Sequence, residues 1–268
     1  MSKRKFLDQV AAATMELTGT LTNMMWDGNY LLEDENPKSP PKPCSSAVLW
    51  RYMTFEKYID MLFRRGAFFS YPCKLEDRHE AVLPRTTYKR LLVRLQQIMP
   101  GFEYYHNGIL QMISDNLRNQ HVVSCWHEMK HESHTMWRAY ANRGTGITVQ
   151  TSFESLQKAF TSCAESGVKY VAGKVDYINY DTDDISMSEG MPLFYKREIF
   201  RTEHEVRIAR FAKANNDSPG VLCETDIDEL VHKVVISPFT KDWEFEVVKA
   251  TTAKFNKSLV DKIEFSTQ

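Results

Sequence analysis

From residue 47 onward, short apolar runs typical of strands alternate with amphipathic stretches typical of helices. The first three elements are predicted as a strand at 47–52, a helix at 54–64 and a strand at 67–71. Further strands are predicted at 121–126, 147–151, 168–177, 200–211, 232–236 and 262–265, and helices at 86–98, 105–119, 133–142, 153–163 and 243–255. The strands are too irregularly spaced for a repeating parallel barrel. The pattern therefore predicts an α+β domain with a mixed or antiparallel, split sheet and flanking helices.

The first 46 residues follow a different pattern. Apolar residues recur at helical spacing over 4–25, which predicts an amphipathic helix. Pro37, Pro40, Pro41 and Pro43 then exclude a helix or a central strand over 33–46 and indicate a linker. We expect residues 1–46 to form a helical extension and residues 47–268 a single domain. The extension is interpreted as an oligomerisation arm, an inhibitory lid or a mobile tail, the first of which predicts a homo-oligomer through the N-terminal helix.

Composition narrows the class of partner. The 34 Lys and Arg residues against 35 Asp and Glu give a formal net charge of −1, so the whole chain does not attract nucleic acid or anionic membrane. No apolar run approaches the roughly 20 residues needed to span a bilayer, and the first residues lack the apolar region of a signal peptide. A cytoplasmic protein without a membrane partner is expected. The five cysteines form no Cys-x-x-Cys pair, which favours reduced thiols.

The segment Phe200–Phe211 is the most informative for chemistry. As a strand it places Glu203, Glu205 and Arg207 on one face, because side chains two apart point the same way about 6.5–7 Å from each other. Two carboxylates at that distance repel unless a cation, a hydrogen-bond network or a substrate compensates them. The cluster is interpreted as an ion network that stabilises the fold or as an active site.

Several other residues are candidates for the same site. Arg51, at the end of an apolar strand, is predicted to hold a phosphate or carboxylate, or to pair with one of the two glutamates. Ser70 ends the next strand and opens a polar loop in which Asp77 and Glu80 are candidate supporting groups. Trp137 and Tyr140, three apart on one helix face, are predicted either to stack on a planar ligand or to pack against the sheet.

Other chemistries find weaker support. His127, His131 and His134 lack the spacing of a helical metal pair, so no metal site is assigned to them. The turn at 143–146 leads into a strand and lacks the third glycine of a dinucleotide fingerprint. A hydrolase or nuclease remains an alternative, with a divalent cation held by four carboxylates: Asp77, Glu80, Glu203 and Glu205.

Taken in order, these motifs resemble a bacterial family known as domain of unknown function 2971 over roughly Leu49 to Phe265. The resemblance rests on Arg51-Tyr52, Phe69-Ser70, Glu76 to Glu80, Ser124-Cys125, Met136 to Ala141, and Glu203-His204-Glu205-Val206-Arg207. Glu76 and Arg78 depart from the Asn and Pro of the family pattern, whereas the acidic positions Asp77 and Glu80 are kept.

The order of Arg on a first strand, Ser on a second and Glu on a late strand is also similar to the plan of ADP-ribosyltransferases. That resemblance implies NAD as substrate, bound by Arg51, Ser70, Tyr71, Trp137, Tyr140 and Arg207, with Glu203 and Glu205 catalytic. It implies an ADP-ribosyltransferase or NAD glycohydrolase, with an unidentified protein or nucleic-acid acceptor and a role as a toxin or in phage defence. A third hypothesis is a non-catalytic binding or regulatory module whose polar network only stabilises the domain.

Overall fold

A computed structural model describes residues 39–267 except 142–144, 164–167, 189–190 and 213–217. The helix predicted over 4–25 lies outside the described residues. Within the described part of the chain, no helix is long and apolar enough to cross a membrane.

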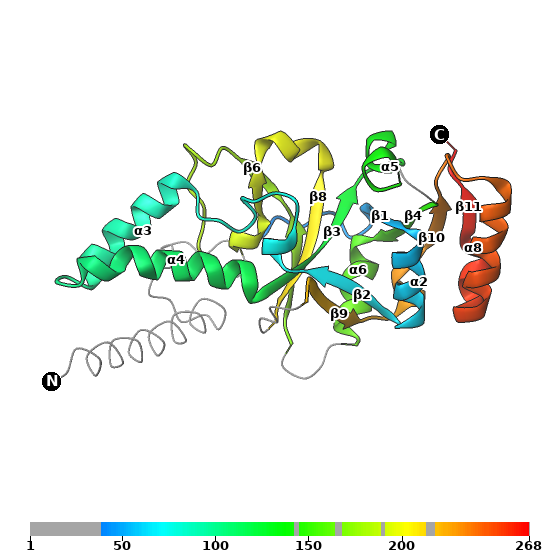
Figure 1. The fold of residues 1–268 in the computed structure, drawn as a ribbon, viewed down its shortest axis with the longest axis horizontal. Helices are drawn as coiled ribbons and strands as arrows, with labels where there is room; N and C mark the ends of the chain where they lie inside the picture. The colour runs from blue at the N-terminus through cyan, green and yellow to red at the C-terminus, as the bar shows by residue number, and fades with distance from the viewer. Residues whose placement is uncertain (1–38, 142–144, 164–167, 189–190, 213–217, 268) are drawn as a thin grey trace.

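A mixed, mostly antiparallel sheet forms the centre of the molecule (Figure 1). Its order is β11-β10-β4-β1-β3-β2-β9, with β8 also paired to β3, and β5 to β8. The strands are β1 (Val48–Thr54), β2 (Gly66–Ser70), β3 (His121–Glu128), β4 (Gly146–Ser152), β5 (Tyr170–Lys174), β8 (Glu205–Phe211), β9 (Gly220–Glu224), β10 (Lys233–Ile236) and β11 (Ile263–Phe265). Only the β10–β11 ladder of this sheet is parallel.

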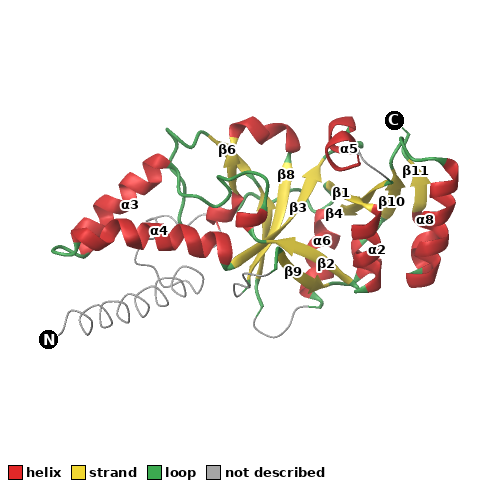
Figure 2. Ribbon diagram, viewed as in Figure 1, coloured by secondary structure: helices red, strands yellow, loops and turns green. Residues whose placement is uncertain are grey.

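Helices cover both faces of the sheet (Figure 2). One apolar core lies between the sheet and α2 (Phe55–Phe63), α6 (Phe153–Thr161), α7 (Ile227–Leu230) and α8 (Asp242–Phe255). On the opposite face, α3 (Arg85–Ile98) and α4 (Glu103–Asn119) enclose a second core, and α5 (His134–Ala141) a third. Alternating residues of each strand pack into opposite cores. Val206 and Ile208 of β8 pack in the first core, and Ala209 packs in the second.

The sheet divides at β3. β8 pairs with one edge of β3 along its length, so β1 and β2 must share the other edge. β1 pairs near one end, at Trp50↔His127, and β2 near the other, at Ser70↔Val123. The two strands therefore diverge, and the opening between them is called the fork below.

A long connection between β5 and β8 carries short elements whose buried apolar side chains belong to the second core. It contains the parallel pair β6 (Asp176–Ile178) and β7 (Tyr195–Arg197) and the 3₁₀ helices η2 (Met191–Phe194) and η3 (Glu198–Glu203). Two further 3₁₀ helices are η1 (Pro72–Lys74) and η4 (Lys257–Lys262). This connection supplies much of the candidate site.

The described end of the proline-rich segment lies against the edge strand β5. The amide of Lys174 donates to the Pro41 carbonyl at 2.7 Å. A Cβ at Gly173 would come within 2.5 Å of the Pro40 side chain, so the close approach requires glycine.

The predicted α+β class is confirmed, and most predicted elements recur within a few residues. Two differ in kind. The predicted strand at 168–177 is two strands, β5 and β6, and the predicted strand at 200–211 begins only at Glu205, after η3.

Candidate active site

Glu203 and Glu205 do not share a strand face, contrary to the prediction. Glu203 ends η3, and Glu205 is the first residue of β8. His204 between them adopts the left-handed conformation, with φ 44° and ψ 50°. This turn breaks the two-residue alternation, so only Glu205 and Arg207 have the predicted common face.

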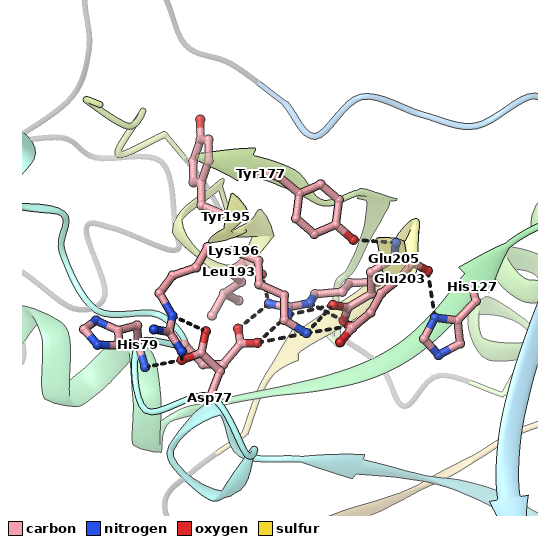
Figure 3. Close-up of polar contacts among 12 residues, drawn as sticks. Asp77, His79, His127, Tyr177, Leu193, Tyr195, Lys196, Glu203 and Glu205 are labelled. Carbon is pink, nitrogen blue, oxygen red and sulfur yellow. Dashed lines mark hydrogen bonds and ion pairs between the residues drawn. The ribbon is translucent and has the colours of Figure 1, made fainter. Parts of the chain in front are cut away.

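A lysine brings the two glutamates together again (Figure 3). Lys196 on β7 places its Nζ 2.7 Å from Glu203 Oε2, 3.1 Å from Glu205 Oε2 and 3.5 Å from Glu80 Oε1. Its ammonium thus lies among three carboxylates, the position that a bound cation would need. Lys196 is 8% exposed.

Arg207 closes the buried side of the same group. Its Nε donates to Glu205 Oε1 at 2.6 Å, and its Nη2 donates to Glu80 Oε1 at 2.9 Å. Its Nη1 donates to the Leu193 carbonyl at 2.7 Å. Glu80, Lys196, Glu203, Glu205 and Arg207 are called the ion cluster below.

The carboxyl groups of the ion cluster differ in accessibility. The side chains of Glu80 and Glu205 are 1% exposed, whereas that of Glu203 is 23% exposed. Glu203 is therefore the cluster carboxylate that a substrate can reach without rearrangement.

Their proton affinities differ too. Burial alone would raise the pKa of Glu205, but the charges of Arg207 and Lys196 and hydrogen bonds from Arg207 and Cys125 hold it well below its usual range. Burial raises the pKa of Glu203, and Lys196 offsets only part of that effect. Glu205 is thus an anion at neutral pH, while Glu203 is the weaker acid and the better suited to exchange a proton.

Arg51 lies in the fork, not in the ion cluster. Its Nη2 donates to the Phe68 carbonyl of β2 at 2.6 Å, and its guanidinium lies 5.7 Å from the Trp126 ring centre. Among the described residues no carboxylate forms an ion pair with it. Burial lowers the pKa of Arg51, as expected for a cation that lacks a close counter-charge.

Tyr140 is within electrostatic range of groups in both the fork and the ion cluster. Burial raises the pKa of the Tyr140 hydroxyl well above its usual value, and Cys125, Glu203 and Glu205 raise it further. The same hydroxyl partly offsets the lowering of the Arg51 pKa, so it lies within electrostatic range of both groups. Tyr140 is 44% exposed and accessible to a ligand.

The other two aromatic candidates are core residues. Trp137 is fully buried, with its Nε1 donating to Glu132 at 2.9 Å, and Tyr71 is 2% exposed. The packing interpretation therefore holds for Trp137, and neither ring is open to a ligand. Ser70 is half-buried at the end of β2, opposite Val123, on the strand face of Cys125 and Glu205.

The two candidate supporting acids divide between two networks. Glu80 belongs to the ion cluster. Asp77 pairs instead with Arg197, whose Nη2 lies 2.7 Å from Asp77 Oδ1. Burial opposes ionisation of Asp77, but Arg197 and the His79 amide outweigh it and lower the Asp77 pKa.

The sequence analysis did not identify several site residues that lie on β3 and on the connection between β5 and β8. Lys196 and Arg197 lie in a stretch to which no element was assigned. The Tyr177 hydroxyl accepts from the Glu205 amide at 2.8 Å. His127 Nδ1 lies 2.8 Å from the Glu203 carbonyl, and burial lowers the pKa of His127, so the ring is a neutral donor there. The one feature of the sequence that could have indicated Lys196 is its position directly after the apolar run 191–195.

A hollow of about 580 Å³ lies next to the turn at His204. It is lined by strand ends and by the start of β1, including Val48, Glu128, Lys174, Tyr177, His204 and Glu205. Two of the lining residues, Lys174 and Glu128, form an ion pair at 2.6 Å.

In residues 39–267, apart from the undescribed gaps, no group of three His, Cys, Asp or Glu side chains is arranged to hold a metal ion. Comparison with protein-family models and with the sequences of characterised proteins finds no match. The family resemblance and the ADP-ribosyltransferase plan therefore stay predictions from the motifs.

Proposed function

We propose that this protein is an NAD-consuming enzyme that transfers ADP-ribose to an acceptor or to water. The observation that carries the proposal is the accessible Glu203 carboxylate, held by Lys196 beside a buried and fully paired set of charges. Cleavage of the N-glycosidic bond develops positive charge on the ribose carbon. A carboxylate fixed beneath that carbon stabilises the transition state more than the ground state.

Arg51 supplies the complementary group for the anionic part of the substrate. A half-buried guanidinium without a carboxylate partner costs free energy, which a bound phosphate offsets through charge-assisted hydrogen bonds. The Tyr140 hydroxyl is within electrostatic range of both Arg51 and Glu203, and its side chain is 44% exposed, so it is assigned to contact the nicotinamide or its ribose. Ser70, at the end of β2, is assigned a supporting contact with the substrate at the fork.

In the proposed reaction, Glu203 accepts the proton that the acceptor must lose. The bonding electrons leave with nicotinamide, and an acceptor hydroxyl or water forms the new bond to the ribose carbon. The acceptor proton passes to Glu203, whose raised pKa suits it to this exchange. Glu205 and Arg207 are buried against each other, so their proposed role is to position Lys196 and thereby Glu203.

The test is nicotinamide release from NAD by the purified wild type and a Glu203→Gln variant, followed by mass spectrometry with cell lysate as acceptor source. We expect release to fall at least ~100-fold, the equivalent of about 2.7 kcal/mol of lost transition-state stabilisation. The matched control is Glu198→Gln in the same 3₁₀ helix, whose side chain is 63% exposed. Unchanged release by Glu203→Gln, or equal loss in both variants, contradicts the proposal.

A non-catalytic binding or regulatory module is the second candidate, favoured by the internal pairing of the ion cluster. In that case the wild type releases no nicotinamide, and cluster variants change only the melting temperature. The metal-dependent hydrolase is less well supported, because the Lys196 ammonium occupies the space between the three carboxylates. A role in phage defence or as a toxin stays a prediction.

A further inference from the structure

α3 and α4 form a helical hairpin at the end of the molecule opposite α8, and the outer face of α3 carries exposed cations (Figure 1). Over residues 85–98 the helix has four basic residues and no acidic one. Arg85, Lys89 and Val93 are exposed and follow one another at intervals of four, so they form one row along the helix. Arg94, in the adjacent row, is also exposed. Arg85, Lys89, Val93 and Arg94 are called the basic face below.

The basic face lacks counter-charges in the described part of the chain. Arg90, the fourth basic residue of α3, forms an ion pair with Asp184 at 2.6 Å. No carboxylate among the described residues forms an ion pair with the three cations of the basic face. The chain as a whole is nearly neutral, so this local excess of cations indicates an acidic partner.

Exposed apolar side chains accompany these cations. Val93 is 53% exposed, and Tyr104 of α4 is 91% exposed. The Tyr88 hydroxyl donates to the Asn107 side chain of α4 at 2.9 Å. Lys89 follows Tyr88, and Tyr104 precedes Asn107 by about one turn, so the basic face borders the α4 surface that carries Tyr104.

Gly108 leaves the same surface of α4 bare. It follows Tyr104 by one helical turn, and among the described residues no atom outside its own helix backbone lies within 4 Å of the position a Cβ would take. Glycine weakens the interior of a helix, and the packing of the hairpin does not require it here. A bare backbone at this position lets another segment approach the hairpin closely.

The N-terminal segment has the opposite charge. Residues 6–36 contain no Lys or Arg. Their acidic residues are Asp8, Glu16, Asp27, Glu33, Asp34 and Glu35. The helix predicted over 4–25 also carries apolar residues at helical spacing, and such a stripe needs an apolar surface to cover it. This segment therefore matches the hairpin in both charge and apolar character.

The chain is long enough to bring the two together within one molecule. The Pro41 carbonyl accepts from the Lys174 amide, and the Tyr180 carbonyl accepts from the Arg85 amide. From Lys174 to Tyr180 the chain spans at most about 21 Å. From Glu33 to Pro41 it spans up to about 28 Å. The acidic run 33–35 can therefore reach the start of α3.

We propose that residues 6–36 dock on the outer face of the α3–α4 hairpin of the same molecule, with their carboxylates against the cations of the basic face. The short tether raises the effective concentration of the segment, so individually weak surface contacts suffice. The docking does not depend on the proposed enzymatic function, because it uses no residue of the ion cluster or the fork. It differs from the predicted homo-oligomer, in which this segment contacts a second copy.

Carbodiimide cross-linking of the whole chain, followed by peptide mass spectrometry, tests the contact, because the reagent joins a lysine to a carboxylate only where the two touch. We expect Lys89, the single lysine of α3, to be linked to an acidic residue of 6–36. A mixture of ¹⁵N-labelled and unlabelled protein separates links within one chain from links between two copies.

Two lysines calibrate the experiment. The Lys158–Glu229 ion pair, at 2.8 Å, is the internal standard that should always be linked. Lys254, exposed on α8 at the other end of the molecule, should form no link to residues 6–36. The proposal is overturned if the standard forms without the Lys89 link, if Lys254 is linked to the segment as often as Lys89, or if the Lys89 links join only different copies.

Charge reversal tests the role of the basic face. Arg85→Glu with Arg94→Glu keeps Lys89 and should lower the yield of its link at least ~10-fold, because two attractive charges become repulsive. The matched control is Lys254→Glu with Lys257→Glu, two exposed sites at the opposite end of the molecule. The Lys158–Glu229 link shows that each variant is folded. An unchanged yield in the hairpin variant, or an equal loss in both variants, overturns the proposal.

Discussion

At the scale of single residues, Lys196 explains how so many like charges can be buried together. The carboxylates of Glu80 and Glu205 are almost inaccessible to water, and ionised groups in that position need close counter-charges. Burial alone would lower the pKa of Lys196, but Glu205, Glu80 and Glu203 raise it above its usual value. Lys196 is therefore charged at neutral pH.

Removal of this ammonium should be costly. We expect Lys196→Met to lower the free energy of unfolding by roughly 3–5 kcal/mol, the range for breaking a buried pair by deleting one partner. Urea denaturation at neutral pH measures the loss.

The matched control is Lys158→Met, which deletes an ion pair with Glu229 from a lysine that is 65% exposed. Its cost should stay below about 1 kcal/mol. Equal losses for the two variants would show that the ion cluster does not depend on Lys196.

At the scale of elements, the turn from η3 to β8 decides where Glu203 lies. Residues with β-branched or bulky side chains rarely adopt the left-handed conformation, in which Cβ crowds the backbone. His204 adopts it with an exposed side chain, so the conformation is imposed by its neighbours. One such neighbour is Glu128, whose amide donates to the His204 carbonyl at 2.9 Å. The turn moves Glu203 out of the strand and towards Lys196.

Substitution at His204 should therefore reveal backbone strain and little else. We expect His204→Val to lower the free energy of unfolding by about 1–2 kcal/mol, while His204→Asn, which tolerates this conformation, changes it by less than ~0.5 kcal/mol. Urea denaturation of both variants gives the comparison. Thr202→Val, an exposed site in η3 without a positive φ, is the control. If Val and Asn at position 204 prove equivalent, the left-handed conformation at this turn stores no backbone strain.

At the scale of the whole molecule, the ion cluster couples stability to pH. The folded-state pKa of Glu205 is depressed, so its contribution is present above its usual pKa of about 4.3 and is lost as the pH falls towards the folded-state value. Glu203 acts in the opposite sense, because its raised pKa makes ionisation unfavourable in the folded protein.

We expect the free energy of unfolding of the wild type to decline as the pH falls below about 5. Glu205→Gln should be less stable at neutral pH and should show a shallower decline in acid. Urea denaturation at a series of pH values measures both slopes. Parallel curves for the wild type and the variant would remove Glu205 as a source of acid sensitivity.

Much of the fold follows from short-range pattern. Two-residue and helical periodicities located most strands and helices, and the alternation along 205–208 correctly placed Glu205 and Arg207 opposite Val206 and Ile208. The pattern failed at Glu203, because a left-handed residue between two polar side chains leaves no trace in hydrophobic spacing. It also could not show that Trp137 and Tyr71 are buried and Tyr140 is not.

The sequence by itself determined the fold class, the burial of alternating strand residues and the presence of unusual charge near the start of β8. Tertiary structure alone decided how that charge is compensated. Glu80 reaches Arg207 across 127 residues, and Arg51 meets β2 only because β1 and β2 share one edge of β3. Local periodicity reports which side of an element is buried, because burial depends on each residue's own polarity. The identity of an ion-pair partner depends instead on which distant elements pack together, and chain spacing does not carry that information.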